Sequence, residues 1–196
     1  MKVSKIASVS GAAFLMAQMA SADKLSLNEI SDYLNDLKTA EARFEQINDD
    51  GTVSTGTVYI KRPGKMRFEY NPPDRALVLA SANAVYIFDG KSNQSPETYP
   101  LRRTPLSIIL GRNVNLGQAD MVVGHAFDGK ATVITAQDPK HRQYGSIQMK
   151  FTGAPVQLRQ WIVNDSGGGQ TTIILEDMKA GGSLPNTLFD LPEREN

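Results

Sequence analysis

Apolar and polar residues alternate along the chain, most regularly between residues 65 and 70. Met66, Phe68 and Tyr70 fall on one face of an extended chain, and charged residues fall on the other. This alternation is typical of an antiparallel sheet with one buried face. Just before it, Pro63 presets φ for a turn and Gly64 tolerates a positive φ at the next position. The stretch from residue 57 to residue 73 therefore predicts two strands joined by a tight turn.

The same period of two recurs over most of the chain. Ile147, Met149 and Phe151 repeat it in a second regular strand. Asp-Gly pairs that begin at residues 50, 89 and 128 lie between or beside such segments and are typical of hairpin turns. Residues 184–192 predict a final strand or edge segment. The pattern predicts one large antiparallel sheet, with strands near residues 41–48, 53–61, 65–71, 75–81, 84–89, 120–127, 131–137, 144–152, 156–163 and 170–177.

A helical pattern precedes the sheet. Ser26 and Glu29 fit a capping box, in which a Ser cap is followed three residues later by Glu. Apolar residues then recur every three or four positions and form a stripe along one side of the helix. The stripe consists of Leu27, Ile30, Leu34 and Leu37. We expect this helix to lie on the apolar face of the sheet.

Residues 96–117 interrupt the alternation and predict a second, shorter helix. Thr104 and Pro105 are typical of an N-cap and a first helical position, and Gly111 of the position after a helix ends. Its apolar face consists of Leu106, Ile109 and Leu110. A helix of about two turns is not stable alone in water, so it should dock on the sheet, and it can also leave it. The whole pattern predicts a mainly β protein with helices, an α+β fold.

The first 22 residues have the features of a secretory signal peptide. Lys2 and Lys5 form a positive start, residues 6–19 carry no charge, and residues 20–22 read Ala-Ser-Ala, a small-residue cleavage site. The alternative is a buried N-terminal helix. We expect a mature chain of one domain, residues 23–196, in a bacterial periplasm, with extracellular secretion as the second choice.

Composition excludes several classes of function. The mature chain has 19 basic and 21 acidic residues, a net charge of −2, so no basic excess suggests nucleic acid or an anionic membrane. Cysteine is absent, which excludes a disulfide, a thiol nucleophile and a Cys-based metal site. The two histidines, His125 and His141, have no metal-binding spacing. We expect no metal and no cofactor.

No spacing of residues indicates catalysis, and we do not expect an enzyme. The carboxylate pairs Asp49-Asp50 and Glu176-Asp177 should point to opposite faces of a strand, although a hydrolase site assembled across strands stays open. The glycine-rich loop at residues 165–169 is followed by a β-rich segment, which disfavours a phosphate site. Trp161, among Leu158, Ile162 and Val163, favours packing over a role as a ligand platform.

Residues 59–73 resemble the LolA family, periplasmic carriers of outer-membrane lipoproteins. The shared pattern is a Lys-Arg-Pro turn, an aromatic-bearing strand and a Pro after it, with Gly56 before the first strand. The resemblance continues through residues 77–90, at Thr104-Pro105-Leu106 and at Phe189-Asp190-Leu191-Pro192. Met66 stands where relatives often carry a second aromatic residue.

The resemblance implies an unclosed, strongly curved antiparallel β-barrel covered by a helical lid, with a hollow that takes acyl chains. By that resemblance Arg62 would be the latch, a guanidinium that holds the lid by hydrogen bonds to the helix backbone. The predicted lining consists of Phe44, Met66, Phe68, Tyr70, Ile147, Met149 and Phe151, with Leu106, Ile109 and Leu110 from the lid helix. The expected partners are acylated lipoproteins, an inner-membrane lipoprotein-releasing ABC transporter and an outer-membrane receptor. We expect a monomer, and the resemblance assigns no role to Arg102 and Arg103. A carrier or sensor for another lipid on the same fold is the alternative.

Overall fold

The computed structural model describes residues 23–92, 94–118 and 120–192. The expected signal peptide, residues 1–22, lies outside the described residues. Within them, eleven strands form one sheet in the order β6-β5-β4-β3-β2-β1-β11-β10-β9-β8-β7. The strands are β1 (Thr39–Ile47), β2 (Val53–Lys61), β3 (Lys65–Tyr70), β4 (Leu77–Ser81), β5 (Ala84–Phe88), β6 (Glu97–Pro100), β7 (Val122–Phe127), β8 (Thr132–Gln137), β9 (Ser146–Thr152), β10 (Gln157–Asn164) and β11 (Gln170–Ala180).

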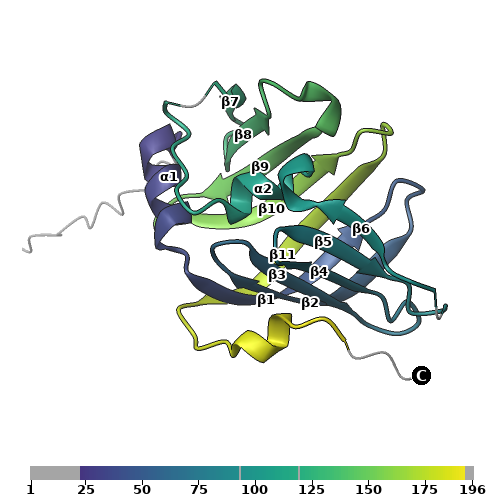
Figure 1. The fold of residues 1–196 in the computed structure, drawn as a ribbon. Helices are drawn as coiled ribbons and strands as arrows, with labels where there is room; N and C mark the ends of the chain where they lie inside the picture. Colours follow the sequence, from purple (N-terminus) through teal and green to yellow (C-terminus); the bar gives the residue numbers. More distant parts are fainter. Residues whose placement is uncertain (1–22, 93, 119, 193–196) are drawn as a thin grey trace, which may run out of the picture.

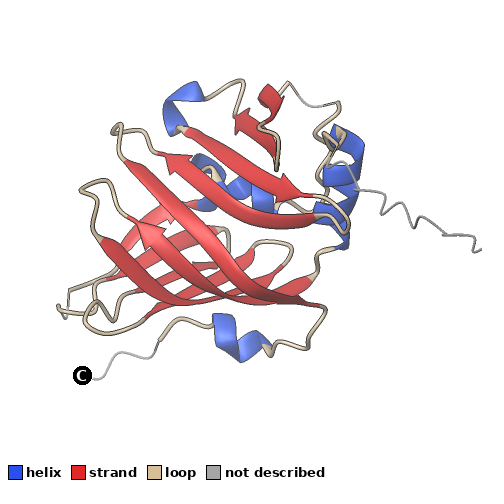
Figure 2. Cartoon of the chain, turned by 180° about the vertical axis from the view of Figure 1, so that it is seen from behind, coloured by secondary structure: helices blue, strands red, loops and turns tan. Residues whose placement is uncertain are grey.

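Every neighbouring pair of strands is antiparallel. The strands β6 and β7 are the two edges and do not pair with each other, so the sheet stays unclosed. The first strand and the last strand, β1 and β11, pair in the middle of the order. The sheet is curved, and its two halves face each other across the concave side (Figures 1 and 2). The predicted curved, unclosed antiparallel sheet is confirmed.

The helices are α1 (Leu27–Asp36), α2 (Leu106–Leu110) and the 3-10 turns η1 (Leu101–Arg103), η2 (Arg142–Tyr144) and η3 (Asn186–Phe189). The predicted capping box is confirmed, because Ser26 and Glu29 exchange hydrogen bonds between side chain and backbone at the start of α1. Ile30 and Leu34 of α1 and Ile109 and Leu110 of α2 are buried in the same core as the concave face of the sheet. In Figure 1, α2 lies between the two halves of the sheet.

The start and end of α2 differ from the prediction. Thr104 is not the N-cap, because its hydroxyl donates to the carbonyl of Leu101 at 2.8 Å and the helix begins after Pro105. Gly111 follows the helix with φ −56°, so the position does not use the left-handed conformation that favours glycine. The 3-10 turn η1 directly precedes α2, and the pattern of apolar residues did not predict this turn.

Two further segments differ from their predictions. The edge strand β6 was not predicted; it has four residues, ends at Pro100 and is exposed throughout, so it carries no alternation. The C-terminal segment is not a strand. It forms η3 against β3 and β4, where Phe189 is 1% exposed. Cations on the outer face of the β2–β3 hairpin hold it: Lys65 Nζ donates to Asn186 Oδ1 at 3.2 Å and Arg67 Nη1 to the Leu188 carbonyl at 3.2 Å.

The aromatic residues of the concave face pack edge to face. Phe44 lies 5.2 Å from Phe68 and 5.1 Å from Tyr70 between ring centroids, and Phe68 lies 6.2 Å from Trp161. Gly56, opposite Phe44 on β2, leaves room for that ring. A Cβ atom at this position would lie 2.1 Å from the Glu69 carbonyl oxygen and 2.7 Å from the Phe44 ring. The glycine is therefore required by close packing.

Candidate functional site

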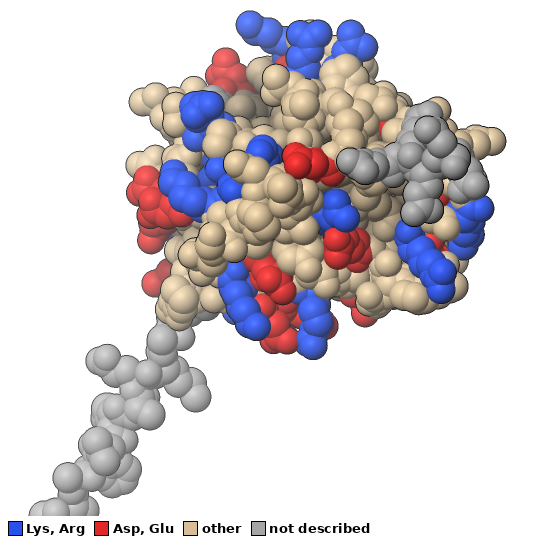
Figure 3. All heavy atoms as spheres, turned by 60° about the horizontal axis from the view of Figure 1, so that its bottom comes forward, with Lys and Arg blue, Asp and Glu red and all other residues tan. Residues whose placement is uncertain are grey.

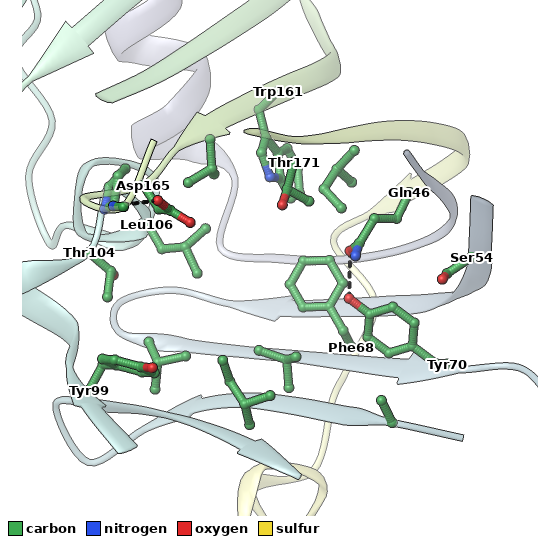
Figure 4. A pocket seen from close by; sticks show the side chains of 18 of the residues that line it. Gln46, Ser54, Phe68, Tyr70, Tyr99, Thr104, Leu106, Trp161, Asp165 and Thr171 are labelled. Atoms are coloured by element: carbon green, nitrogen blue, oxygen red, sulfur yellow. Dashed lines mark hydrogen bonds between the residues drawn. The ribbon is translucent and has the colours of Figure 1, made fainter. Parts of the chain in front are cut away.

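A cavity of about 670 Å³ lies on the concave side of the sheet, between the strands β1–β6 and the strands β10 and β11 (Figure 4). The lid segment, residues 101–116, borders it through Arg103, Thr104, Pro105 and Leu106. Much of the apolar part of its wall comes from alternate residues of five strands. These are Phe68, Val78, Val85, Ile87, Trp161, Val163 and Ile173.

The structure divides the predicted lining residues into two groups. Phe68, Tyr70 and Leu106 border the cavity. The other seven lie in the packed core and are 0–2% exposed. They are Phe44, Met66, Ile147, Met149, Phe151, Ile109 and Leu110. All ten residues therefore lie on the concave side of the sheet, but only three of them border the cavity.

The helix α1 explains this division, because it fills the other end of the concave side. Tyr33 contacts the Phe151 ring edge to face at 5.9 Å between centroids and accepts a hydrogen bond from the Leu158 amide at 3.1 Å. Burial raises the pKa of the Tyr33 hydroxyl, so it stays protonated. Among the residues of α1 and α2, only Leu106 borders the cavity.

Sequence reasoning missed several residues of the cavity wall. Val85 and Ile87 lie on a predicted strand and could have been assigned by extending the period of two to it. Tyr99, Tyr144 and Asp165 come from β6, η2 and the β10–β11 loop, and no local pattern indicated them. Trp161 is 1% exposed and packs on Phe68, as predicted, yet it also borders the cavity.

Arg62 lies where the two helices end. Its side chain is buried, at 8% exposure, and Nη2 donates to the carbonyl of Gly111, the C-cap of α2, at 2.6 Å. Nη1 lies 3.5 Å from the carbonyl of Leu37, the C-cap of α1. A cation is favourable at these positions because the C-terminal carbonyl groups of a helix carry partial negative charge. Burial lowers the pKa of the guanidinium from its usual value, and Nε has no hydrogen-bond partner among the described residues.

Polar contacts also fix the end of the lid segment that follows α2. The Gly64 amide donates to the Leu110 carbonyl at 3.0 Å. Asn35 of α1 makes two bonds to Val114, accepting from its amide at 2.9 Å and donating to its carbonyl at 2.8 Å. The Leu116 amide donates to the Ser31 hydroxyl at 2.9 Å. This end of the lid segment is thus held by α1 and by the β2–β3 turn.

The other end of the lid segment has different contacts. The guanidinium carbon of Arg103 lies 6.0 Å from the centroid of the Tyr144 ring, within the range of a cation–π contact. His141 stacks on the same ring at 4.8 Å with an angle of 6°. Arg103 thus contacts η2, and both Arg102 and Arg103 are exposed.

Charged groups elsewhere in the structure form surface pairs. The predicted opposition of Glu176 and Asp177 is wrong, because Arg43 Nη2 contacts both carboxylates, at 3.4 and 2.5 Å. A register shift in the β1–β11 pairing and a φ of +50° at Asp177 put the two side chains together. Basic and acidic side chains lie interspersed on the face that Figure 3 shows.

The described residues include no group of three or more His, Cys, Asp or Glu side chains that could hold a metal ion. His125 Nε2 lies 2.8 Å from the Leu25 carbonyl, and His141 Nδ1 lies 3.2 Å from Asp138. None of the helices in the described part of the chain is long and apolar enough to cross a membrane.

Comparison with known proteins shows which family the chain belongs to. Residues 35–192 match the family model of the outer membrane lipoprotein carrier protein LolA. The chain belongs to the LolA family. The match includes Arg62, α2 and every residue of the cavity wall. Membership of the LolA family supports a role as a lipoprotein carrier.

Individual relatives are similar to most of the chain. The chain is 24% identical to the outer-membrane lipoprotein carrier protein of Azotobacter vinelandii over 97% of this chain and 94% of that protein. It is 23% identical to the same carrier of Coxiella burnetii (strain CbuK_Q154) over 90% and 87%. Among solved structures, a LolA superfamily protein from Nitrosomonas europaea has a TM-score of 0.42 and 10% identity, over 85% of this chain and 98% of that one.

Proposed function

We propose that this LolA family protein carries lipoproteins across the periplasm by shielding their acyl chains in the cavity under the lid segment. The observation that carries the proposal is a largely apolar cavity of about 670 Å³ that is bordered by residues 103–106, at the start of the short helix α2. Cavities of this size and lining suit apolar ligands. The signal-like residues 1–22 support export to the periplasm.

The free energy of acyl-chain hydration explains why such a carrier is needed. A triacylated lipoprotein has roughly 40 methylene groups, and each costs about 0.8 kcal/mol to leave in water. Passage through an aqueous compartment is therefore prohibitive unless the chains are shielded. The carrier does not need to break a covalent bond, so a cavity without reactive side chains is sufficient.

The size of the cavity supports a lid that moves. If each methylene takes up about the 30 Å³ that a water molecule occupies in the liquid, the cavity holds roughly 20 methylene groups. This is about half of the acyl chains of one lipoprotein. The sheet, α1 and α2 share one packed core, but α2 has only five residues. Displacement of α2 would open the space that Ile109 and Leu110 now fill.

Arg62 is suited to control this movement. Its bond to Gly111 joins a charged donor to a helix end, and such a bond contributes about 1.5–3 kcal/mol. A bond of this strength keeps the lid segment closed but can be broken when a partner binds. An inner-membrane ABC transporter would load the carrier, and an outer-membrane receptor would unload it.

A release assay tests the proposal. The protein from residue 23 onward is added to energised spheroplasts, and the soluble fraction is analysed for acylated lipoprotein bound to it. We expect a stoichiometric soluble complex. Leu106→Glu, which puts a carboxylate into the cavity wall, should abolish it, whereas Val123→Glu, at a position 55% exposed on the edge strand β7, should not.

Two results would contradict the proposal. If both variants release lipoprotein as the unchanged protein does, the cavity is not the binding site. If no lipoprotein is released and mass spectrometry finds another lipid bound, the protein is a carrier or sensor for that lipid instead.

A further inference from the structure

The part of the cavity wall beside the β1–β2 hairpin is polar. Gln46, Ser54 and Tyr70 border the cavity beside the β1–β2 hairpin, and Figure 4 shows their polar atoms on that side. Gln46 and Ser54 are direct cross-strand partners, so their side chains are neighbours on the concave face. Ser54 is one of the few buried polar residues of the described chain. Polar groups in such a place require hydrogen-bond partners.

These groups form a directed chain of hydrogen bonds. The Tyr70 hydroxyl donates to Gln46 Oε1 at 2.5 Å, and Gln46 Nε2 donates to Asn48 Oδ1 at 2.5 Å. Asn48 Nδ2 then donates to the hydroxyl groups of Thr52, at 2.9 Å, and Ser54, at 3.3 Å. Burial raises the pKa of Tyr70 to about 12, so its hydroxyl remains a donor at physiological pH.

Two donors of this chain remain available to a ligand. A primary amide has two N–H groups, and Gln46 uses one of them on an acceptor within the described residues. Ser54 accepts a hydrogen bond and, in the described part of the chain, donates its proton to no acceptor. Both donors are neutral and belong to neighbouring side chains that border the cavity.

We infer that Gln46 and Ser54 form a subsite for the carbonyl oxygen of an ester or amide that joins an acyl chain to its head group. The subsite rests on the proposed function and adds to it the class of chemical group recognised within the lipid. A buried carbonyl that finds no donor carries a penalty, and here two donors offset it. Both donors are neutral, and Lys91 on the same cavity wall already faces Asp74 at 3.7 Å. A carboxylate would therefore lose its hydration against neutral donors, so the subsite favours esters and amides over free fatty acids.

Ligands with and without carbonyl groups test the subsite. Dioctanoylglycerol has two ester carbonyls, the dioctyl ether of glycerol has the same chains without them, and octanoate has a free carboxylate. Trp161 is the single tryptophan and borders the cavity, so its fluorescence reports binding. We expect the diester to bind about tenfold more tightly than the diether, as one or two buried hydrogen bonds allow, and octanoate to bind weakly.

Variants test whether the preference for the diester depends on Gln46 and Ser54. Ser54→Ala removes one donor, and Gln46→Met with Tyr70→Phe replaces two bonded partners by apolar groups of similar shape, which preserves packing. Each variant should reduce the preference for the diester without weakening the binding of the diether. Thr171→Val removes a hydroxyl that borders the same cavity outside the chain of bonds and should leave the preference unchanged.

The outcomes separate the subsite from the carrier function. Equal affinity for diester and diether in the unchanged protein overturns the subsite and leaves the carrier proposal intact. A preference that survives in Ser54→Ala and in the double variant also overturns it. Failure of both glycerol lipids to bind contradicts the proposed function itself. If the double variant does not fold, Ser54→Ala alone decides the result.

Discussion

Replacing Arg62 with leucine tests whether its contacts hold the lid segment closed. The change removes the 2.6 Å bond to the Gly111 carbonyl and the longer contact with Leu37. A hydrogen bond from a charged donor contributes about 1.5–3 kcal/mol. The closed state should therefore lose that amount relative to an open one, which raises the open fraction by about tenfold to a hundredfold.

The effect on global stability should be smaller than the effect on the lid segment. Burial of the guanidinium carries a desolvation penalty, and Nε has no partner within the described residues. Leucine removes this penalty while it leaves the Gly111 carbonyl without its donor. The free energy of unfolding should therefore change less than the opening equilibrium of α2.

Hydrogen exchange measures the two effects separately. The Gly64 amide donates to the Leu110 carbonyl, so it reports opening of the lid segment, and the amides of Ser107 and Ile108, which bond to carbonyls within the segment, report unwinding of α2. We expect these amides to exchange faster in Arg62→Leu, and urea denaturation to shift less. Arg67→Leu is the matched control, because Arg67 lies in the next strand, on the outer face, and contacts the C-terminal segment. Unchanged exchange at Gly64, with reduced global stability, would refute the latch.

Further predictions concern packing, the fixed end of the lid segment and pH. Asn35→Ala leaves the amide and carbonyl of Val114 unpaired, so we expect a loss of about 1–3 kcal/mol and faster exchange at Val114; normal protection there would contradict the role of Asn35. Gly56→Ala puts a Cβ 2.1 Å from the Glu69 carbonyl oxygen and should lower the free energy of unfolding by about 3 kcal/mol or more. Gly182→Ala, with nothing within 4 Å of its Cβ, should change it by less than about 0.5 kcal/mol, and similar urea midpoints for the two variants would disprove the packing argument. Burial raises the pKa of Tyr70 from 10.0 to about 12, so its contribution to stability is complete below pH 10 and is lost as pH rises toward 12, by up to about 2–3 kcal/mol. Tyr70→Phe should show a shallower decline in urea titrations over this range, and an equal slope would exclude Tyr70 as the cause.

Local chemistry made much of the fold predictable. The capping box of α1 lies within four residues, and the alternation in β3 and β9 depends on a strand burying one face. Where the local pattern was weak, the prediction was incomplete or wrong. The strand β6 has no buried residue to mark it, and the C-terminal segment forms η3 because Phe189 is buried against β3 and β4.

The candidate site was predictable only in part, because a hollow depends on what lies opposite each strand. The sequence by itself determined that Phe68, Met149 and Phe151 face inward, since the period of two assigns the face of every strand residue. The tertiary structure alone decided that Phe68 borders a cavity while the other two pack in the core, because α1 and α2 cover only part of the concave side. It also decided the contact between Arg62 and Gly111, which are 49 residues apart. The curvature of the unclosed sheet brings the turn after β2 to the ends of both helices. A local sequence pattern cannot predict a contact between residues so far apart in the chain.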